Sequence, residues 1–405
     1  MKATFLLCAF LSIAGVSVAQ WQNLYSFTNP AISFITVNTK LYAGLAGGGV
    51  YMSHDEGGTW NAVNTGIQFG GGYIFSLTNE KDSLYAGAFG EVYISNNGGG
   101  NWTSLDLNLD LNDFVYAVKV KDNYLFAGIG HGPGNGIYRK ALTAAGWLPM
   151  HNGIPDNLSV NALAVDGNQL LAATDSGVYV SSDNGAAWTR PGNATNPVVP
   201  VKSLLVIDGN ILAGTTNGIY TSQDHCNTWN TATGLPTNSV VTCISANNGY
   251  IVAGTYASAF YTTDNGLTWN VIPNAVEGNV SFYSVTALNN YFYAGTGGGI
   301  TLGSFVSKIS MSFLSLSGEK KLIEGAISIE PNPWVTQTVL HSTLMLNDAA
   351  LTLFDSFGRR VQQLKNISGK SIILYRGNLP AGLYIVSIRE HNNPIATRKI
   401  AIADN

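Results

Sequence analysis

Residues 41–60 read LYAGLAGGGVYMSHDEGGTW and hold, in order, every part of a unit that recurs along the chain. A strand ending in Ala-Gly (once Ala-Ala) is followed by a β-branched residue with an aromatic neighbour, a polar turn and a tryptophan. The first of these parts returns every 40 to 45 residues, in seven copies that begin at Leu41, Leu84, Leu125, Leu170, Ile211, Ile251 and Phe292. This period is typical of a β-propeller with four strands per blade and predicts seven blades.

The N-terminal residues 1–19 are typical of a secretory signal. Lys2 precedes an apolar stretch at 5–14, and Ser17-Val18-Ala19 offers a small-residue cleavage site. The apolar stretch is too short to span a bilayer. We therefore expect a mature chain that begins at Gln20, with an N-terminal anchor helix as the alternative.

The composition agrees with an all-β protein. Only 11% of the 405 residues are charged, 11% are aromatic and 46 are glycine, which is too apolar for a disordered chain and too irregular for collagen. Signal cleavage would remove Cys8 and leave Cys226 and Cys243. Two cysteines cannot staple a chain of this length, so we expect free thiols, with one bridge as the alternative.

Tryptophans open the fourth strand in six of the seven copies, and the seventh copy has none. Trp21 stands alone at the start of the mature chain. We predict that the strand beginning there completes the last blade of a propeller over residues 20–304, because this closure removes two open sheet edges. The six repeat tryptophans are Trp60, Trp102, Trp147, Trp188, Trp229 and Trp269.

The turn before the tryptophan carries the strongest local signal. The first copy has Ser53, Asp55, Gly57 and Thr59 at alternate positions before Trp60. Four further copies place their turn residue and tryptophan in the same register, as Asn97 and Trp102, Asp183 and Trp188, Asp224 and Trp229, and Asp264 and Trp269. This pattern resembles the Asp-box (BNR) repeat of sialidase-like, sortilin-like and photosystem-assembly-factor-like propellers.

Two readings of these carboxylates are open, either metal-binding or catalytic groups, or acceptors that lock hairpin turns. A short carboxylate or amide accepts hydrogen bonds from the N–H groups of its own turn. Asn97 favours the second reading, because an amide replaces a turn acceptor but not a catalytic acid. Cys226 stands where the other copies have glycine, and we expect it to distort its turn.

Ligands of propellers usually bind where the loops between second and third strands and the links between blades emerge. The candidates on that face are His131, Asp175, Asn217, Tyr256 and Asp113. His131 lies in a glycine-rich insertion of the third copy. A glycosidase reading would need two carboxylates about 5 to 9.5 Å apart, for which the candidates are Asp110, Asp113 and Asp156.

Charge and arginine content exclude some functions. Residues 20–305 contain 8 Lys and Arg against 17 Asp and Glu, which disfavours nucleic acid as a partner. Sialidases hold a carboxylate with three arginines, whereas this region has only Arg139 and Arg190. The sequence indicates no cofactor and no metal. Neutral glycans or protein surfaces suit the loop composition better.

The repeat ends after Ser304. Residues 305–326 read as a linker, and residues 327–405 predict a small antiparallel β-sandwich. Its expected strands are 338–342, 350–354, 360–364, 371–374, 383–389 and 398–402.

Three motifs of this tail occur in the order and spacing of a known domain. They are Pro331-Asn332-Pro333, the turn from Asp355 through Gly358 and Arg359, and the stretch Leu379-Pro380-Ala381-Gly382-Leu383-Tyr384. The tail resembles the type A C-terminal sorting domain of the type IX secretion system of Bacteroidetes. Glu330 departs from the aromatic residue common there.

That resemblance implies export across both membranes, contact with the secretion machinery and removal of the tail outside the cell. We therefore expect a secreted or cell-surface protein whose propeller binds a glycan or a protein without catalysis. The alternative is a glycoside hydrolase or lyase acting on extracellular polysaccharide.

Overall fold

The computed structural model describes residues 21–68, 72–192, 196–272, 280–297, 304–311, 327–355, 359–390 and 393–403. The predicted signal at 1–19 and the motif residue Gly358 lie outside these ranges. The described residues of 21–311 form one compact unit, and those of 327–403 form a second. Within the described ranges, none of the helices has the length and apolar character to cross a membrane.

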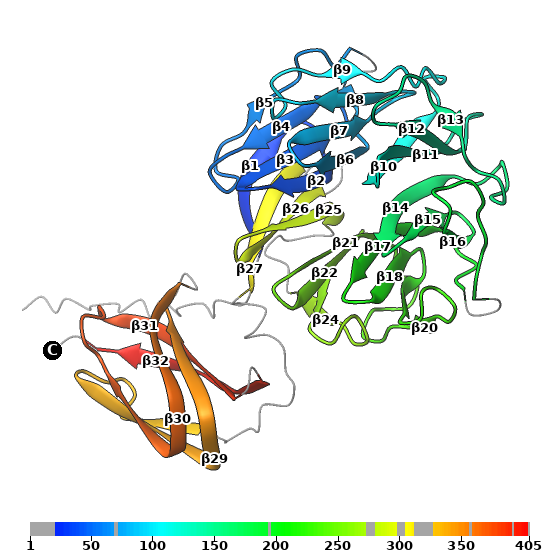
Figure 1. The fold of residues 1–405 in the computed structure, drawn as a ribbon. Coiled ribbons are helices and arrows are strands. Elements are labelled where there is room, and N and C mark those ends of the chain that lie inside the picture. The colour runs from blue at the N-terminus through cyan, green and yellow to red at the C-terminus, as the bar shows by residue number, and fades with distance from the viewer. Residues whose placement is uncertain are drawn as a thin grey trace, which may run out of the picture. The chain divides into compact units, whose positions relative to one another are not determined.

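The first unit consists of seven antiparallel sheets, which we call blades 1 to 7 in chain order (Figure 1). Blade 1 contains β2 (Ala31–Val37), β3 (Lys40–Leu45), β4 (Val50–Ser53) and β5 (Asn61–Ala62). Blade 2 contains β6 (Ser76–Glu80), β7 (Ser83–Gly87), β8 (Val92–Ser95) and β9 (Thr103–Ser104). Blade 3 contains β10 (Phe114–Lys121), β11 (Tyr124–Gly130), β12 (Gly136–Ala141) and β13 (Leu148–Pro149).

Blade 4 contains β14 (Val160–Asp166), β15 (Gln169–Thr174) and β16 (Gly177–Ser181). Blade 5 contains β17 (Val201–Ile207), β18 (Asn210–Thr215), β19 (Gly218–Ser222) and β20 (Asn230–Thr231). Blade 6 contains β21 (Val241–Asn247), β22 (Tyr250–Thr255), β23 (Ala259–Thr262) and β24 (Asn270–Ile272). In blade 4 a single bridge between Val180 and Thr189 stands in the place of a fourth strand.

Blade 7 is built from both ends of the propeller sequence. It contains β25 (Ser281–Leu288), β26 (Tyr291–Gly297) and β27 (Ser304–Ser310), and β1 (Gln22–Phe27) pairs with β27 at its outer edge. Trp21 is buried, and its ring centroid lies 5.3 Å from that of Phe282. The predicted closure by the N-terminal strand is therefore confirmed.

The last blade also corrects one boundary. We expected a linker from residue 305, but β27 pairs along its whole length with β26 and completes the sheet. Val306 and Ile309 are buried on this strand, but without a tryptophan the sequence offered no marker for it.

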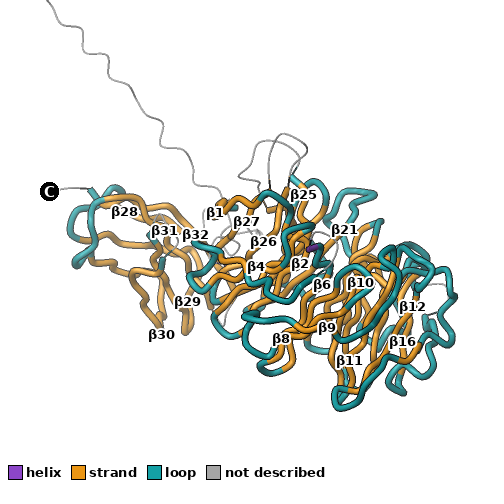
Figure 2. The backbone as a smooth tube through the Cα atoms, turned by 90° about the horizontal axis from the view of Figure 1, so that it is seen from above, coloured by secondary structure: helices purple, strands orange, loops and turns teal. Residues whose placement is uncertain are grey.

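The inner strands form a closed ring. Each of β2, β6, β10, β14, β17, β21 and β25 contacts the inner strand of the next blade, and β25 returns to β2. At this last seam the Thr36 hydroxyl donates to the Ala287 carbonyl at 2.8 Å, and the Ser284 hydroxyl donates to the Ala31 carbonyl at 2.8 Å. Figure 2 shows this unit as strands joined by loops and turns.

The repeated Ala-Gly has a steric cause. At six glycines of this motif, an added Cβ would lie 2.5 to 2.9 Å from a side-chain atom at the start of the next inner strand, closer than real Cβ contacts. At these six places only glycine lets neighbouring blades approach this closely. These neighbours are Ile74 for Gly44, Val115 for Gly87, Val160 for Gly128, Val241 for Gly214, Phe282 for Gly254 and Ala31 for Gly295.

The second unit is a five-stranded antiparallel sheet. Its strands are β28 (Ile327–Glu330), β29 (Gln337–Phe354), β30 (Arg360–Tyr375), β31 (Gly382–Glu390) and β32 (Asn393–Ile402), with β30 paired to β29. The expectation of four short strands between 338 and 374 is wrong, because β29 and β30 pair through the predicted breaks with several register shifts. Such bulges bend a strand without ending it.

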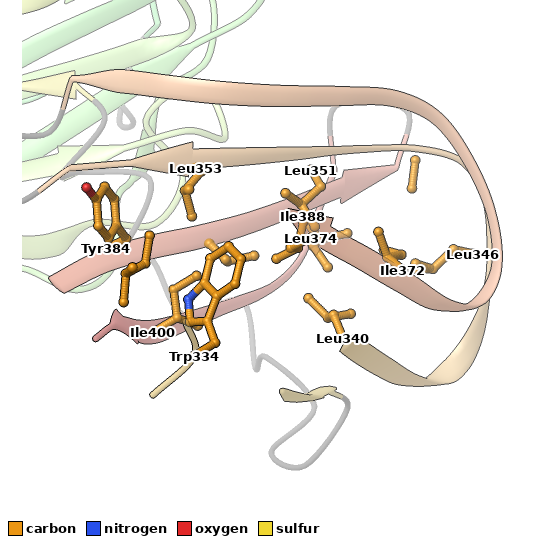
Figure 3. Close-up of a cluster of buried hydrophobic side chains, with 13 residues drawn as sticks. Trp334, Leu340, Leu346, Leu351, Leu353, Ile372, Leu374, Tyr384, Ile388 and Ile400 are labelled. Carbon is orange, nitrogen blue, oxygen red and sulfur yellow. The ribbon is translucent and has the colours of Figure 1, made fainter. Parts of the chain in front are cut away.

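The bend brings both halves of β29 onto one core. Leu340 and Leu346 from the first half and Leu351 from the second belong to one buried cluster with Trp334 (Figure 3). Apolar side chains from all of the long strands thus remove each other from water, which is the main stabilising contribution in a unit this small.

Candidate functional site

The turns before the tryptophans share one hydrogen-bond pattern. In blade 1 the Asp55 carboxylate accepts hydrogen bonds from the Thr59 N–H at 2.8 Å and the Thr59 hydroxyl at 2.7 Å, and the Ser53 hydroxyl accepts from the Gly57 N–H at 2.9 Å. The corresponding acceptors Asn97, Asp183, Asp224 and Asp264 receive the N–H four residues ahead at 2.8 to 3.0 Å.

These hydrogen bonds lower the pKa of the turn carboxylates. The Thr59 N–H and hydroxyl hold the pKa of Asp55 down at about 2. The N–H of Ala187 lowers the pKa of Asp183, and the hydroxyl of Thr228 does the same for Asp224. For Asp264, burial raises the pKa, but hydrogen bonds from Thr262 and Thr268 outweigh it. All four therefore act as ionised acceptors at neutral pH.

Cys226 does not distort its turn, contrary to our expectation. Its N–H donates to the Ser222 hydroxyl at 3.0 Å, as in the other copies. Its φ of 70° is in the left-handed region that glycine occupies elsewhere, and the side chain is fully buried in an apolar cluster. Burial raises the pKa of the Cys226 thiol to about 12. Burial also raises the pKa of Cys243, to about 11, and both cysteines are free.

The turn in one blade also contacts the first hairpin of the preceding blade. Lys121 donates to the Asn184 side chain at 2.8 Å, linking blades 3 and 4. The His225 ring lies 2.6 Å from the Asp166 carboxylate, linking blades 4 and 5. The tryptophans add to these links, since the Trp102 indole donates to the Val63 carbonyl of the preceding blade at 2.7 Å.

The opposite face, which we call the mouth face, holds the starts of the inner strands and the loops between second and third strands. Near its start each inner strand carries a side chain at an equivalent position, and in six of the seven blades the register shifts there. Such bulges redirect side chains. The seven residues, all half-buried, are Ile32, Phe75, Tyr116, Asn161, Lys202, Thr242 and Tyr283.

Six rings gather on the mouth face at the seam of blades 2 and 3, and we call them the aromatic seam. Phe75 and Phe114 stack at 4.9 Å, and His131 stacks on Phe114 at 4.7 Å, so three rings form one column. Tyr73 is 37% exposed and His131 is exposed, while the other members are half-buried. The aromatic seam consists of Tyr73, Phe75, Phe89, Phe114, Tyr116 and His131.

Asp113 holds the loop that carries His131. The carboxylate is only 2% exposed and accepts hydrogen bonds from the Gly134 N–H at 2.8 Å and the Asp110 N–H at 3.1 Å. His131 adopts a left-handed φ of 64°, which is uncommon outside glycine. Two of the candidates predicted from sequence, Asp113 and His131, thus lie together, and of these two it is His131 that is open to solvent.

A polar cluster adjoins the aromatic seam. The Asp175 carboxylate accepts hydrogen bonds from the Asn161 amide at 3.0 Å and the Lys202 ammonium at 3.2 Å. Burial raises the pKa of Asp175, but the Asn161 and Lys202 contacts outweigh it and the net pKa is lowered. The two groups lie on neighbouring inner strands, since β10 carries Tyr116 and contacts β14, which carries Asn161. Burial raises the pKa of Tyr116, and the charge of Asp175 raises it further.

The remaining candidates lie apart from these contacts. Asn217 is exposed and its N–H donates to the Thr215 hydroxyl at 2.9 Å. Tyr256 is 54% exposed. The Asp110 carboxylate holds Asn112.

The charged groups weighed for hydrolase chemistry have other partners. Asp156 is 95% exposed and lies 3.9 Å from His151. Arg139 donates to the Asn184 carbonyl at 2.7 Å, and Arg190 donates to the Asn196 carbonyl at 3.2 Å. Both arginines are therefore engaged in loop and turn contacts.

Sequence reasoning missed most of the aromatic seam and the polar cluster. Tyr73 and Phe89 lie outside the strands and Phe114 begins β10, so no single strand pattern groups these three residues. The signal lies in a comparison of the seven repeats, since the residue that follows an apolar position at the start of each inner strand varies from aromatic to polar.

Motif residues of the tail form short hydrogen-bonded links. The exposed Asn332 side chain accepts the Ala401 N–H at 2.8 Å, and the Pro331 carbonyl accepts from Thr338 at 2.7 Å. Pro333 is exposed beside the buried Trp334. These contacts hold the first motif against β29 and the last strand, β32.

The other two motifs close turns. The Asp355 carboxylate accepts from the Arg359 N–H at 2.9 Å and from its Nε at 2.7 Å. The Tyr384 hydroxyl donates to the Pro380 carbonyl at 2.8 Å, and Gly382 begins β31. A cavity of about 720 Å³ adjoins this turn and is lined by Val335, Thr336, Arg376, Gly377, Asn378, Leu379 and Pro380.

The closed ring of sheets and the tail define this chain as a β-propeller protein with a C-terminal sorting domain. Residues 115–255 match the family model described as the DUF6242 beta propeller domain, and residues 328–403 match the secretion system C-terminal sorting domain. The sorting domain points to a secreted or outer-surface location. A search of the curated proteins finds no match.

Several solved structures share the fold. YCF48 from Cyanidioschyzon merolae is 13% identical with a TM-score of 0.55, over 72% of this chain and 99% of that chain. The extracellular domain of the putative one component system BT4673 from B. thetaiotaomicron is 14% identical with a TM-score of 0.56, over 96% of this chain and 60% of that chain. The extracellular domain of the putative hybrid two component system BT3049 from B. thetaiotaomicron is 17% identical with a TM-score of 0.55, over 93% and 56%.

Proposed function

We propose that this protein is exported through the type IX secretion system and binds carbohydrate outside the cell at the mouth face of its propeller, without catalysis. Residues 1–19 would direct the first export step, and residues 327–405 would contact the secretion machinery. The observation that carries the binding role is the aromatic seam, which combines stacked rings with solvent access at Tyr73 and His131.

Aromatic rings on a protein surface offer a large contact area at little entropic cost, and they suit ligands that have both apolar and polar groups. Sugar rings are such ligands, because their C–H faces are apolar and their edges carry hydroxyls. The turn carboxylates on the other face have a different role in this proposal. They lock hairpins, and the neighbouring Asn184 and His225 link blades.

The alternative of a glycoside hydrolase or lyase needs an acid and a base that reach the substrate. Of the three carboxylates that are candidates for this acid and base, Asp113 is buried and accepts hydrogen bonds from two backbone N–H groups. Asp156 belongs to the link between blades 3 and 4, outside the aromatic seam. These placements favour binding over hydrolysis.

A glycan array with the mature chain tests the binding role. We expect binding by the wild type and a loss of at least 10-fold in the double variant Tyr73→Ala, His131→Ala. The control is Leu148→Ala, which removes a 59% exposed apolar side chain from β13. Binding to no glycan, or equal binding by the double variant, would contradict the proposal. Release of reducing ends from a bound polysaccharide would instead support the hydrolase.

A further inference from the structure

The mouth face changes character around the ring. The equivalent inner-strand positions are aromatic in blades 2 and 3, as Phe75 and Tyr116, and polar in blades 4 and 5, as Asn161 and Lys202. The ring centroids of Phe75 and Tyr116 lie 5.5 Å apart, and the Nζ of Lys202 lies 3.5 Å from the side-chain Oδ1 of Asn161. The four residues therefore stand at equivalent places on four consecutive inner strands, each in contact with the next, and they make an arc with an apolar half and a polar half.

The polar half is suited to hydroxyl groups. Asp175 and Lys202 are 36% and 37% exposed, so both reach solvent. An ammonium has three N–H donors, and two of them go to Asp175 and Asn161. A sugar hydroxyl both donates and accepts hydrogen bonds, so it can donate one to the Asp175 carboxylate and accept one from the remaining N–H of Lys202.

The charge of the arc disfavours anions. The Asp175 carboxylate already neutralises Lys202, at 3.2 Å, and Asp110 adds an exposed negative charge on the same face. Arg139 and Arg190, the two arginines of residues 20–305, hold backbone carbonyls elsewhere. The carboxylate of an acidic sugar could only accept hydrogen bonds here and would be repelled by Asp175.

We infer that this arc is a binding site for neutral polysaccharide in two adjoining parts, with a sugar ring against the aromatic seam and hydroxyls on Asn161, Asp175 and Lys202. The inference rests on the proposed carbohydrate-binding function and adds the chemical class. Asp175 is its specificity-determining residue, because its charge both receives a hydroxyl proton and excludes acidic sugars.

Affinity electrophoresis of the mature chain tests this in native gels that contain β-glucan, xylan or mannan as neutral probes, and polygalacturonate or alginate as acidic ones. We expect at least one neutral polysaccharide, and neither acidic one, to retard the wild type. Asp175→Asn should weaken neutral binding about 10-fold, the effect of losing a charged hydrogen bond. Because it leaves Lys202 without its counter-charge, it should also allow retardation by polygalacturonate.

The matched control is Asp208→Asn, which removes an exposed charge from the hairpin of blade 5 on the other face. It should change neither result. The gain of acidic binding is a readout that a purely structural role of Asp175 would not give.

The outcomes separate this inference from the proposed function. Retardation of the wild type by acidic polysaccharides alone would overturn the inference and leave carbohydrate binding intact. Asp175→Asn with unchanged neutral binding would overturn the polar part of the site. Retardation by none of the five polysaccharides would overturn the inference, and the glycan array then decides the proposed function separately.

Discussion

Replacing Gly295 by alanine tests the steric origin of the Ala-Gly repeat at the seam where the ring closes. Gly295 lies in β26 of blade 7, against the start of β2 in blade 1. An added Cβ would stand 2.8 Å from the Ser284 hydroxyl oxygen and 2.9 Å from the Ala31 Cβ, and it would overlap the Ala31 carbonyl oxygen. Because that oxygen is backbone, no side-chain rotation relieves the overlap.

The expected cost follows from two contributions. Overpacking a close contact typically costs about 1 to 3 kcal/mol, and the hydrogen bond from Ser284 to the Ala31 carbonyl, 2.8 Å long, would lose about 1 kcal/mol. A total near 3 kcal/mol lowers the melting temperature of a domain this large by about 5 to 10 °C. The one alanine at this place in the repeat, Ala173, pairs with the small Ala162. Gly295 instead pairs with the larger Ser284.

Differential scanning calorimetry of the mature chain measures this shift. The matched control is Gly58→Ala, where the added Cβ would meet nothing nearer than 3.3 Å and the backbone is not left-handed. We expect the control to melt within about 1 °C of the wild type. A Gly295→Ala protein that also melts within 1 °C of the wild type would show that the blades are not packed as closely as described.

Three further predictions concern a turn carboxylate, the N-terminal tryptophan and a link between two blades. Asp183→Asn should have a melting temperature closer to that of the wild type than Asp183→Ala has, since an amide still accepts the turn hydrogen bond. Because the pKa of Asp183 is lowered in the folded state, the carboxylate contributes its full stabilisation above the ordinary pKa of 3.8 and loses it as the pH falls below that value. The difference in melting temperature between the wild type and Asp183→Asn should therefore shrink at acid pH. Trp21→Ala should cost about 3 to 5 kcal/mol in chemical unfolding, because the buried indole packs on Phe282; a loss under 1 kcal/mol would argue against ring closure by this segment. The hydrogen bond that His225 makes to the Asp166 carboxylate raises the pKa of His225. NMR titration should place this pKa above the ordinary 6.5, and Asp166→Asn should lower it. Equal pKa values in the two proteins would argue against this link between blades 4 and 5.

Much of the fold could be predicted because its cause is local and repeated. The Ala-Gly strands and the turns before the tryptophans recur at one spacing, and each satisfies the same steric or hydrogen-bond need in every blade. The partner of Trp21 was predictable for a similar reason, since one copy lacked a fourth strand. The end of blade 7 was missed because Val306 and Ile309 lack the marker that the other copies share.

The candidate site was predicted less well. Loop position alone pointed to His131, Asp113 and Asp175, but it could not show that Asp113 is buried beneath the loop that His131 occupies. Stacking of His131 on Phe114 depends on how the loop after β11 lies against the start of β10 within blade 3. Such a contact brings together residues whose types look like core in one strand and loop in another, so a single sequence does not reveal it.

The most direct test compares one variant from each face in two measurements, the melting temperature and retardation in a neutral-polysaccharide gel. We expect the double variant Tyr73→Ala, His131→Ala to lose retardation and keep its melting temperature. We expect Asp183→Ala to melt at a lower temperature and to be retarded like the wild type at 20 °C. A folded Asp183→Ala protein that no longer binds, together with a mouth-face variant that still does, would contradict the assignment of binding to one face and fastening to the other.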